Sequence, residues 1–558
     1  MAVNDSMTTA AIGPATYVRS LFSKYENVHH PLISDYISSI PETLTGAVNK
    51  VLSSSNSPLS DLVLSNRKKL KLFINKFHDE ANTMTPSVRK SINLLNNPIT
   101  QILVSIHQPN LFAYGGVFKK IILLQTIKGA IEKTQPEKKF INLFLIVDHD
   151  FMDDLWIRLA QLPSIRHSGG ILELRMPVSN SDRWRLVCNM PIPRRTIVDY
   201  WRRQVYSWIR NSSSRYPSKS DKSDFLKNLE EFWHEVEGSY SGAKSHSDFN
   251  AFLISRLLNL MWGYDTLFVR LSDLSPVFED GFKFLISNFG TYSRALSETE
   301  NMFIRQGINT GVSATSYLNA PVWLHCKCGS KASAKIIKNK EEVLLVGTCI
   351  SCKKDLQVNL GNLTNLDIPQ EDIHQLSPRA IPILLLLSRD LGISSYASGT
   401  GGSMDYAMVG SVAFQELSIK IPLTIVWPSK DLYTGLGQSE ALDYLEITNK
   451  TEVTIHKEEL KRKVEDYNAK IKPLLEERST RIKSRQSVDD LLSELFILKE
   501  KQRNMRRLLK AAEKVHSVVE LKPCIIDYAV NFGIVNTERL WRNGLIENDN
   551  LAAPIHMN

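Results

Sequence analysis

Two short apolar runs, residues 102–106 and 143–147, stand out in the pattern of hydrophobic and polar positions along the chain. Both are rich in Val, Ile and Leu, and a helix-like segment at 115–131 lies between them. Continuous runs of this kind are typical of parallel strands that are buried on both faces and joined by a crossover helix. With a third candidate strand at 171–176, they predict one half of a doubly wound sheet.

A second half of the sheet is predicted further along the chain. Residues 266–271 look like a strand that returns the chain to the sheet after a helical segment. Strand-like runs at 394–398 and 423–427 flank a helix-like segment at 406–417. The predicted fold class is therefore α/β, a doubly wound parallel sheet with helical insertions.

Residues 456–519 differ in composition from the rest, because Lys, Glu, Arg, Leu and Ile dominate and the apolar residues fall near heptad spacing. A break at 484–488 predicts two long helices in an antiparallel hairpin or coiled coil. The predicted segments are an N-terminal helical lead-in at 1–98, the first half of the core at 99–198, a helical connecting insertion at 199–320, a cysteine module at 321–365, the second half of the core at 366–450, the coiled coil at 451–520 and a C-terminal tail at 521–558.

The bulk composition narrows the class of protein. With 558 residues, 43% hydrophobic and 23% charged, the chain has ordinary globular composition and room for several domains. No apolar run approaches the roughly 18 residues that a membrane-spanning helix needs, so a cytoplasmic protein without a membrane partner is expected. The net charge of +9 is modest, and much of the excess lies in 457–514. This argues against a nucleic-acid surface over the whole protein.

Polar residues follow the first apolar run. His107, Gln108 and Asn110 come directly after it, and Gly115 and Gly116 follow a few residues later. Ligands of parallel sheets bind beyond the carboxyl ends of the strands, and a helix N-terminus at that place suits a phosphate. The glycines would allow the backbone to approach a ligand closely. An ordinary turn capped by His107 explains the same residues equally well.

Asp148, His149 and Asp150 follow the second apolar run. Two carboxylates beside an imidazole can orient it, raise its pKa, bind a divalent ion or contact ribose hydroxyls. Strand alternation points Asp148 and Asp150 to one side and His149 to the other, so we expect different roles for them. His149 is the best candidate for a general base. The alternative is that one of the carboxylates caps a helix.

A glycine loop follows the predicted strand at 394–398. Its residues Gly399, Gly401 and Gly402 would let backbone amides surround an anion, although glycine clusters also occur in ordinary loops. Arg379 precedes this half of the sheet. Its guanidinium can hold a carboxylate or phosphate with two hydrogen bonds, or it can form a structural ion pair.

Four of the six cysteines fall in two tight pairs, Cys326 with Cys328 and Cys349 with Cys352. With no export signal in view, this spacing favours metal over disulfides. Two such pairs separated by a basic, β-rich stretch resemble a zinc ribbon, in which four thiolates bind a structural Zn²⁺. The first pair is one residue shorter than usual, so His325 is an alternative to Cys326 as the fourth ligand.

The strand-end motifs resemble those of a known family, the bacillithiol-biosynthesis cysteine-adding enzymes, which are cysteine ligases known as BshC. The family carries a Gly-Gln-Gln-x-Gly-Leu-Phe turn after its first strand, to which residues 106–112 (IHQPNLF) are similar. Residues 148–151 (DHDF) resemble its Glu-Asp-His-Asp-Phe element. The loop at 399–402 before Tyr406 resembles its Gly-Pro-Gly-Glu loop, residues 377–379 keep its Ser-Pro-Arg order, and a long helical coiled coil closes both.

The resemblance covers roughly residues 95–520. It implies a Rossmann-like core related to class I synthetases and other nucleotidyltransferases, and dimerisation through the coiled coil. It also implies that the turn at 107–110 and the loop at 399–402 hold the phosphates of ATP with Mg²⁺, while residues 148–150 bind ribose, metal or the acceptor amine. The chain departs from the family at His107, which replaces a glutamine, and in its cysteine module.

The leading hypothesis from sequence is therefore an ATP-dependent ligase that joins an amino acid, cysteine in the resembling family, to an amine acceptor in low-molecular-weight thiol biosynthesis and acts as a homodimer. A second hypothesis is a non-catalytic protein that binds RNA or a nucleotide on a synthetase-like scaffold. It rests on the net positive charge, which includes Lys335, Lys338 and Lys340 in the cysteine module and Arg503, Arg506, Arg507 and Lys510 in the hairpin.

Overall fold

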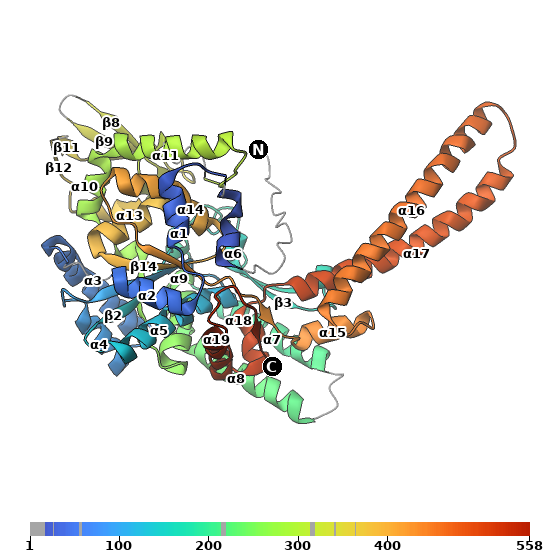
Figure 1. The fold of residues 1–558 in the computed structure, drawn as a ribbon, viewed down its shortest axis with the longest axis horizontal. Helices are drawn as coiled ribbons and strands as arrows, with labels where there is room; N and C mark the ends of the chain where they lie inside the picture. Colours follow the sequence, from blue (N-terminus) through green and yellow to red (C-terminus); the bar gives the residue numbers. More distant parts are fainter. Residues whose placement is uncertain are drawn as a thin grey trace.

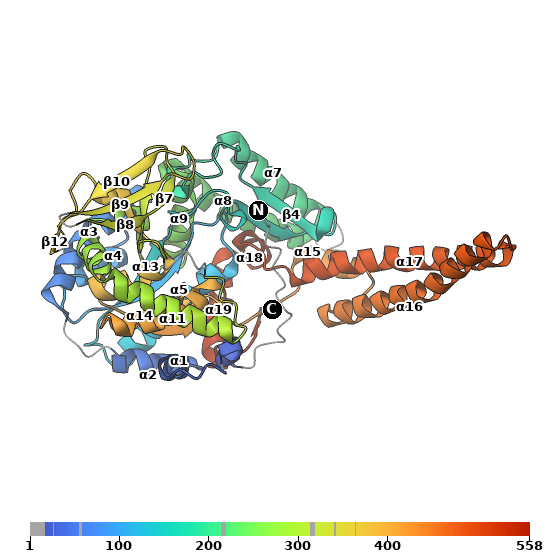
Figure 2. The same cartoon turned by 90° about the horizontal axis from the view of Figure 1, so that it is seen from above.

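The computed structural model describes residues 17–25, 27–54, 59–213, 219–312, 318–339, 342–362 and 364–557. The first sixteen residues of the predicted lead-in and Lys340 of the cysteine module lie outside the described residues. A compact body contains the sheet and most helices, and a long helical hairpin projects from one side of it (Figures 1 and 2).

A five-stranded parallel sheet lies at the centre of the body, with the strand order β15-β14-β1-β2-β5. Its strands are β1 (Gln101–His107), β2 (Phe140–Ile146), β5 (Leu267–Arg270), β14 (Ile393–Ser398) and β15 (Leu423–Val426). The chain builds outward from β1 through β2 to β5 and then crosses back to β14 and β15. The strand order therefore reverses between β1 and β14, which confirms the doubly wound α/β sheet and places its topological switch point.

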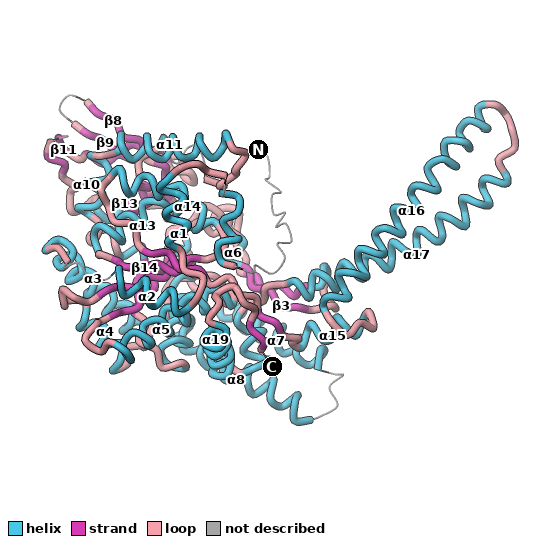
Figure 3. The backbone as a smooth tube through the Cα atoms, in the orientation of Figure 1, coloured by secondary structure: helices cyan, strands magenta, loops and turns pink. Residues whose placement is uncertain are grey.

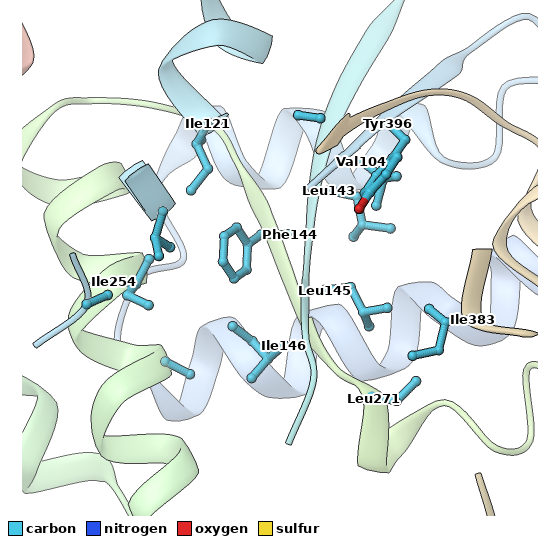
Figure 4. Packing of buried hydrophobic residues seen from close by; sticks show 14 of the residues in the cluster. Val104, Ile121, Leu143, Phe144, Leu145, Ile146, Ile254, Leu271, Ile383 and Tyr396 are labelled. Carbon is cyan, nitrogen blue, oxygen red and sulfur yellow. The ribbon is translucent and has the colours of Figure 1, made fainter. Parts of the chain in front are cut away.

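Both faces of this sheet are buried, as its continuous apolar runs predict. Leu143 and Leu145 of β2 point toward Ile383 of α13, whereas Phe144 and Ile146 point to the opposite face (Figure 4). Ile121 of α5 packs on that second face. All seven residues of β2 are buried, so alternate side chains enter two separate hydrophobic layers.

The third strand predicted from the sequence is not part of the central sheet. Residues 171–175 form β4 (Ile171–Arg175), which pairs in antiparallel fashion with β3 (Leu159–Pro163) in a separate two-stranded sheet. The physical reason is visible in the residues, because 171–175 alternate apolar and polar side chains and bury only one face. That pattern is typical of a half-exposed antiparallel strand, and β5 takes the third place instead.

Helices cover the sheet and connect its strands. The predicted lead-in is helical, with a short 3-10 helix at Val18–Tyr25 before α1. The helices of the body are α1 (Pro31–Ser39), α2 (Leu44–Ser54), α3 (Asp61–Glu80), α4 (Pro86–Leu94), α5 (Gly115–Thr134), α6 (Leu155–Arg158), α7 (Arg195–Ser212), α8 (Lys219–Gly242), α9 (His246–Arg256), α10 (Glu279–Ser287), α11 (Phe289–Arg305), α13 (Ala380–Leu391), α14 (Gly402–Glu416), α15 (Leu436–Tyr444), α18 (Ile525–Phe532) and α19 (Ile534–Asn548).

The cysteine module consists of two small antiparallel sheets. One contains β6 (Val322–His325), β7 (Lys331–Ser333) and β13 (Leu376–Pro378), and the other contains β8 (Lys335–Lys338), β9 (Val343–Thr348) and β10 (Asp355–Asn359). Short two-residue pairs complete the strands, β11 (Gly361–Asn362) with β12 (Asn365–Leu366) and β16 (Asp431–Leu432) with β17 (Ile555–His556). Because β13 leads directly into α13, the module is continuous with the central fold.

The projecting hairpin consists of α16 (Lys450–Lys483) and α17 (Asp489–Glu520), which pack against each other along their length (Figures 1 and 3). The break between them falls where the sequence predicts it. Asn449 caps the first helix by accepting a hydrogen bond from the Glu452 amide. In the part of the chain that the structure describes, no helix is both long and apolar enough to cross a membrane.

Candidate functional site

The carboxyl ends of β1 and β14 meet at the switch point of the sheet, and Lys120 of α5 lies between them. Its Nζ donates a hydrogen bond to the carbonyl oxygen of Ile106 at 3.3 Å. A Cβ placed on Gly399 would stand only 3.4 Å from Cε of Lys120. Helix α14 begins just beyond, with Gly401 as its N-cap and Gly402 as its first residue. The predicted glycine loop and the end of β1 are thus neighbours.

Lys120 was not predicted from the sequence, although its charge is unusual. Its side chain is only 8% exposed, and no carboxylate among the described residues forms an ion pair with it. Burial lowers the pKa of Lys120 to about 8, so the amine is still mostly protonated at neutral pH. A buried cation without a counterion is costly and favours an anionic ligand at this place. The only signal in the sequence is a lysine pair inside an otherwise apolar helical stretch.

His107 at the end of β1 is engaged by its own surroundings. Its Nδ1 lies 3.0 Å from the carbonyl oxygen of Gln108, and its Nε2 lies 3.2 Å from the hydroxyl of Tyr114. Because a carbonyl oxygen only accepts, Nδ1 carries the proton and Nε2 accepts from Tyr114. Burial, with the nearby charge of Lys120, lowers the pKa of His107 to about 3. His107 is therefore neutral, and both nitrogens already have partners.

Gln108 and Asp150 bring the two strand-end motifs together. The Gln108 side-chain amide donates to Oδ2 of Asp150 at 2.6 Å, and both residues are half-buried. Burial lowers the pKa of Lys331 to about 8 and raises the pKa of Tyr406; the charge of nearby Asp150 opposes the first shift and adds to the second. Asp154, four residues on, caps α6 through the Trp156 amide. Asp150 is therefore the carboxylate of the motif that faces other polar side chains of the site.

Asp148 has a different environment from Asp150. Its side chain is completely buried and accepts hydrogen bonds from the amide and the hydroxyl of Ser272, at 3.0 and 2.6 Å. Burial raises the pKa of Asp148 to about 7, and the two hydrogen bonds from Ser272 oppose that rise. Since Ser272 follows β5, Asp148 joins the ends of two neighbouring strands and does not face a ligand.

His149 packs inward against the cysteine module. Its ring centroid lies 4.3 Å from that of His325, with the rings tilted by 67°. The ring is 5% exposed, and Nδ1 has no hydrogen-bond partner. Burial, together with the charge of Lys331, lowers the pKa of His149 well below the usual value. Because a general base must reach its substrate, the half-buried Asp150 fits that role better than the buried His149.

Asn110, Gly115 and Gly116 serve the packing of the protein itself. The Asn110 amide donates to the carbonyl oxygen of Trp156 at 2.5 Å, which holds the turn after β1 against α6. A Cβ on Gly115 would stand 3.0 Å from the ring of Tyr528, and one on Gly116 would meet the ring of Tyr114 at 2.7 Å. The close approach expected at these glycines is therefore to aromatic side chains and not to a ligand.

The cysteine module adds two cations to the site. Lys331 donates to the carbonyl oxygen of His149, and its Nζ lies 4.5 Å from the ring centroid of Trp323. The Arg379 guanidinium lies 4.3 Å from the same ring and donates to the hydroxyl of Ser333 at 2.8 Å. No ion pair with a carboxylate is present for either cation within the described part of the chain. Lys331 therefore adds positive charge beside Asp150, and Arg379 adds positive charge beside Lys331 and Tyr406.

The four predicted cysteines form one cluster. Their Sγ atoms all lie within 4.8 Å of one another, with 3.5 Å between Cys326 and Cys352 and between Cys328 and Cys349. These distances are far longer than the roughly 2 Å of a disulfide and suit thiolates at about 2.3 Å around one tetrahedral ion. Nε2 of His325 instead lies 2.7 Å from the hydroxyl of Ser377. The four cysteines can thus hold a metal ion without His325.

Comparisons with known proteins add no family to this picture. No protein-family model matches the chain, and no curated protein matches it.

Proposed function

We propose that this protein is an ATP-dependent ligase that activates a carboxylate and joins it to an amine. The observation that carries the proposal is Lys120, a buried ammonium group without a carboxylate partner at the switch point of a doubly wound sheet. It is flanked by Gly399 and the N-terminus of α14. A phosphate group bound there would receive a charge-assisted hydrogen bond from Lys120 and amide hydrogen bonds from the helix.

The second side of the site supplies groups for the acceptor. Asp150, fixed by Gln108, is the general base that takes a proton from the attacking amine. Arg379 is placed to hold an anionic group of a substrate. In the reaction, a carboxylate oxygen attacks a phosphorus atom of MgATP and displaces ADP or pyrophosphate. The amine nitrogen then attacks the acyl carbon and displaces the phosphate or AMP, while its proton passes to Asp150.

The four cysteines would hold a structural Zn²⁺, which suits a site whose four ligands all come from the protein. The resemblance to cysteine ligases of bacillithiol biosynthesis suggests cysteine as the amino acid and a homodimer as the working assembly. Cysteine as the substrate is supported by the motifs at 106–112, 148–151 and 399–402 alone.

The first test is calorimetric titration of the protein with MgATP. Wild type is expected to bind, and Lys120→Met is expected to lose binding by at least about tenfold because a charged hydrogen bond is removed. Lys133→Met, an exposed change on the same helix, is the matched control. No binding of MgATP by wild type at millimolar concentration would refute the proposal.

The second test is exchange of labelled pyrophosphate into ATP, measured with each amino acid in turn. Exchange dependent on cysteine would identify both the amino acid and the adenylate route, whereas release of phosphate in place of exchange would identify an acyl phosphate. Asp150→Asn is expected to keep the affinity for MgATP within about twofold and to lower product formation by roughly a hundredfold or more, because only the general base is lost. Unchanged product formation would remove Asp150 from that role.

A further inference from the structure

The first cysteine pair lies on a turn whose neighbouring residues contact two loops of the central fold, 148–151 after β2 and 186–189 after β4. The carbonyl oxygen of Gly329 accepts hydrogen bonds from the Leu186 amide at 2.9 Å and from the Asn189 side chain at 3.2 Å. His325 packs against His149, and Lys331 donates to the carbonyl oxygen of His149. Residues on either side of the cysteine pair therefore hold two separate loops of the central fold.

The second cysteine pair is tied to the first through Lys331 as well. The amide of Ile350, between Cys349 and Cys352, donates to the carbonyl oxygen of Lys331 at 3.2 Å. A metal ion bound by the four sulfurs would join the two cysteine turns next to Lys331, which follows the first turn in the sequence. Metal binding supplies much of the folding energy of small modules of this kind, so the position of Lys331 depends on it.

Lys331 is well placed to transmit this dependence. Its side chain is 4% exposed and lies between the rings of Phe151 and Trp323, with Nζ 4.9 and 4.5 Å from their centroids. Its Nζ fixes the main chain of His149, and its charge acts on the neighbouring Asp150. Little room is left for Lys331 to adopt another rotamer, so the lysine and the loop at 148–151 are held together.

We propose that metal binding by the four cysteines fixes the loop at 148–151 through Lys331, which acts as a positioning residue for Asp150. The part of this proposal that concerns Asp150 as a base rests on the proposed ligase function. The mechanical part, in which the module orders the loop, is independent of that function. The cysteine module is in this view a component of the active site and not an independent domain.

Hydrogen exchange of the backbone amides, followed by mass spectrometry on the zinc-loaded protein, tests the mechanical part without any substrate. Lys331→Met is expected to keep one metal ion per chain and to speed exchange in 148–151 by about tenfold, because one charged hydrogen bond to the main chain is lost. Cys349→Ser is expected to speed exchange in the module and in 148–151 together. Lys335→Met, an exposed change in the same module, is the control and should leave both segments unchanged.

Rescue separates positioning from general destabilisation. Lys331→Arg keeps a cationic donor within reach of the His149 carbonyl and is expected to restore most of the protection in 148–151. If Lys331→Met or loss of the metal leaves exchange in 148–151 at the wild-type rate, the proposal is wrong. Where MgATP binding has been shown, Lys331→Met should lower turnover while keeping nucleotide affinity, so failure to bind MgATP contradicts only the ligase function.

Discussion

Replacing Lys120 by methionine should stabilise the free protein while it weakens nucleotide binding by at least about tenfold. Burial lowers the pKa of Lys120 from 10.5 to about 8. At 1.36 kcal/mol for each pKa unit, the charged form costs the folded state about 3 kcal/mol at neutral pH. Methionine removes this cost and also the hydrogen bond to Ile106, which is worth about 1 kcal/mol. We expect the free energy of unfolding to rise by about 2 kcal/mol at pH 7.

The pH dependence gives this prediction a sign that packing alone would not produce. The pKa of Lys120 is lower in the folded state, so the unfolded chain binds more protons between pH 8 and 10.5. The penalty is complete below about pH 8 and disappears above 10.5. The difference in stability between Lys120→Met and wild type should therefore be largest near neutral pH and shrink as the pH rises toward 10.5.

Urea unfolding of both proteins, followed by tryptophan fluorescence from pH 7 to 10, measures that difference. At the same concentration of MgATP, wild type should be stabilised more than the variant. A variant that is less stable than wild type at pH 7, or that still binds MgATP normally, would show that Lys120 is a structural residue and would remove the main support for a nucleotide site.

Three further predictions concern other parts of the fold. Burial raises the pKa of Asp148 to about 7, so the free energy of unfolding of Asp148→Asn should equal that of wild type near pH 4 and exceed it by up to about 4 kcal/mol above pH 7, where the buried carboxyl is ionised. Urea unfolding that shows the same difference at every pH would contradict this. Gly115→Ala should lower the free energy of unfolding by about 1–3 kcal/mol because its methyl group would contact aromatic rings, whereas Gly129→Ala on the same helix has no atom within 4 Å and should raise it by up to about 1 kcal/mol. Equal effects of the two changes would show that the rings move aside without cost. Cys349→Ser should reduce the bound zinc from one ion per chain to none, whereas Cys188→Ser should keep it, as measured by elemental mass spectrometry. Zinc retained by Cys349→Ser would exclude the four-sulfur site.

The sheet could be predicted where the chain is buried on both faces. Continuous apolar runs indicate β1 and β2, and the single helix between them predicts that the two strands pair in parallel. The error at 171–175 came from treating an alternating segment as equal to these continuous ones, although alternation is the sign of a strand with one exposed face. The cysteine cluster could also be predicted, because metal-binding spacing is local in the sequence.

The polar site could be predicted only in part, because the partner of a polar residue is a property of the fold. Asp148 and Asp150 are equivalent in the sequence, yet one is bonded to Ser272 after a distant strand and the other to Gln108. A glycine in the sequence can indicate a close approach of another group, but it does not identify that group. At Gly115 the group is an aromatic side chain. Lys120 was missed because a lysine within a helical stretch is normally assigned to its exposed face.

The contrast among buried cations is the strongest argument that the switch point binds an anion. Away from it, several buried or nearly buried cations form ion pairs with carboxylates: Lys119 with Asp431, Lys128 with Asp265, Arg256 with Glu235 and Arg270 with Asp248. Arg67 has no carboxylate, but it donates to the carbonyl oxygens of Leu391, Thr100 and Gly392. Lys331 has none either, but it donates to the carbonyl oxygen of His149 and lies between two aromatic rings. Lys120 has one carbonyl oxygen at 3.3 Å and a glycine beside it. Since each of these other cations has a carboxylate or several other partners, the missing partner at Lys120 is best explained by a ligand that brings its own negative charge.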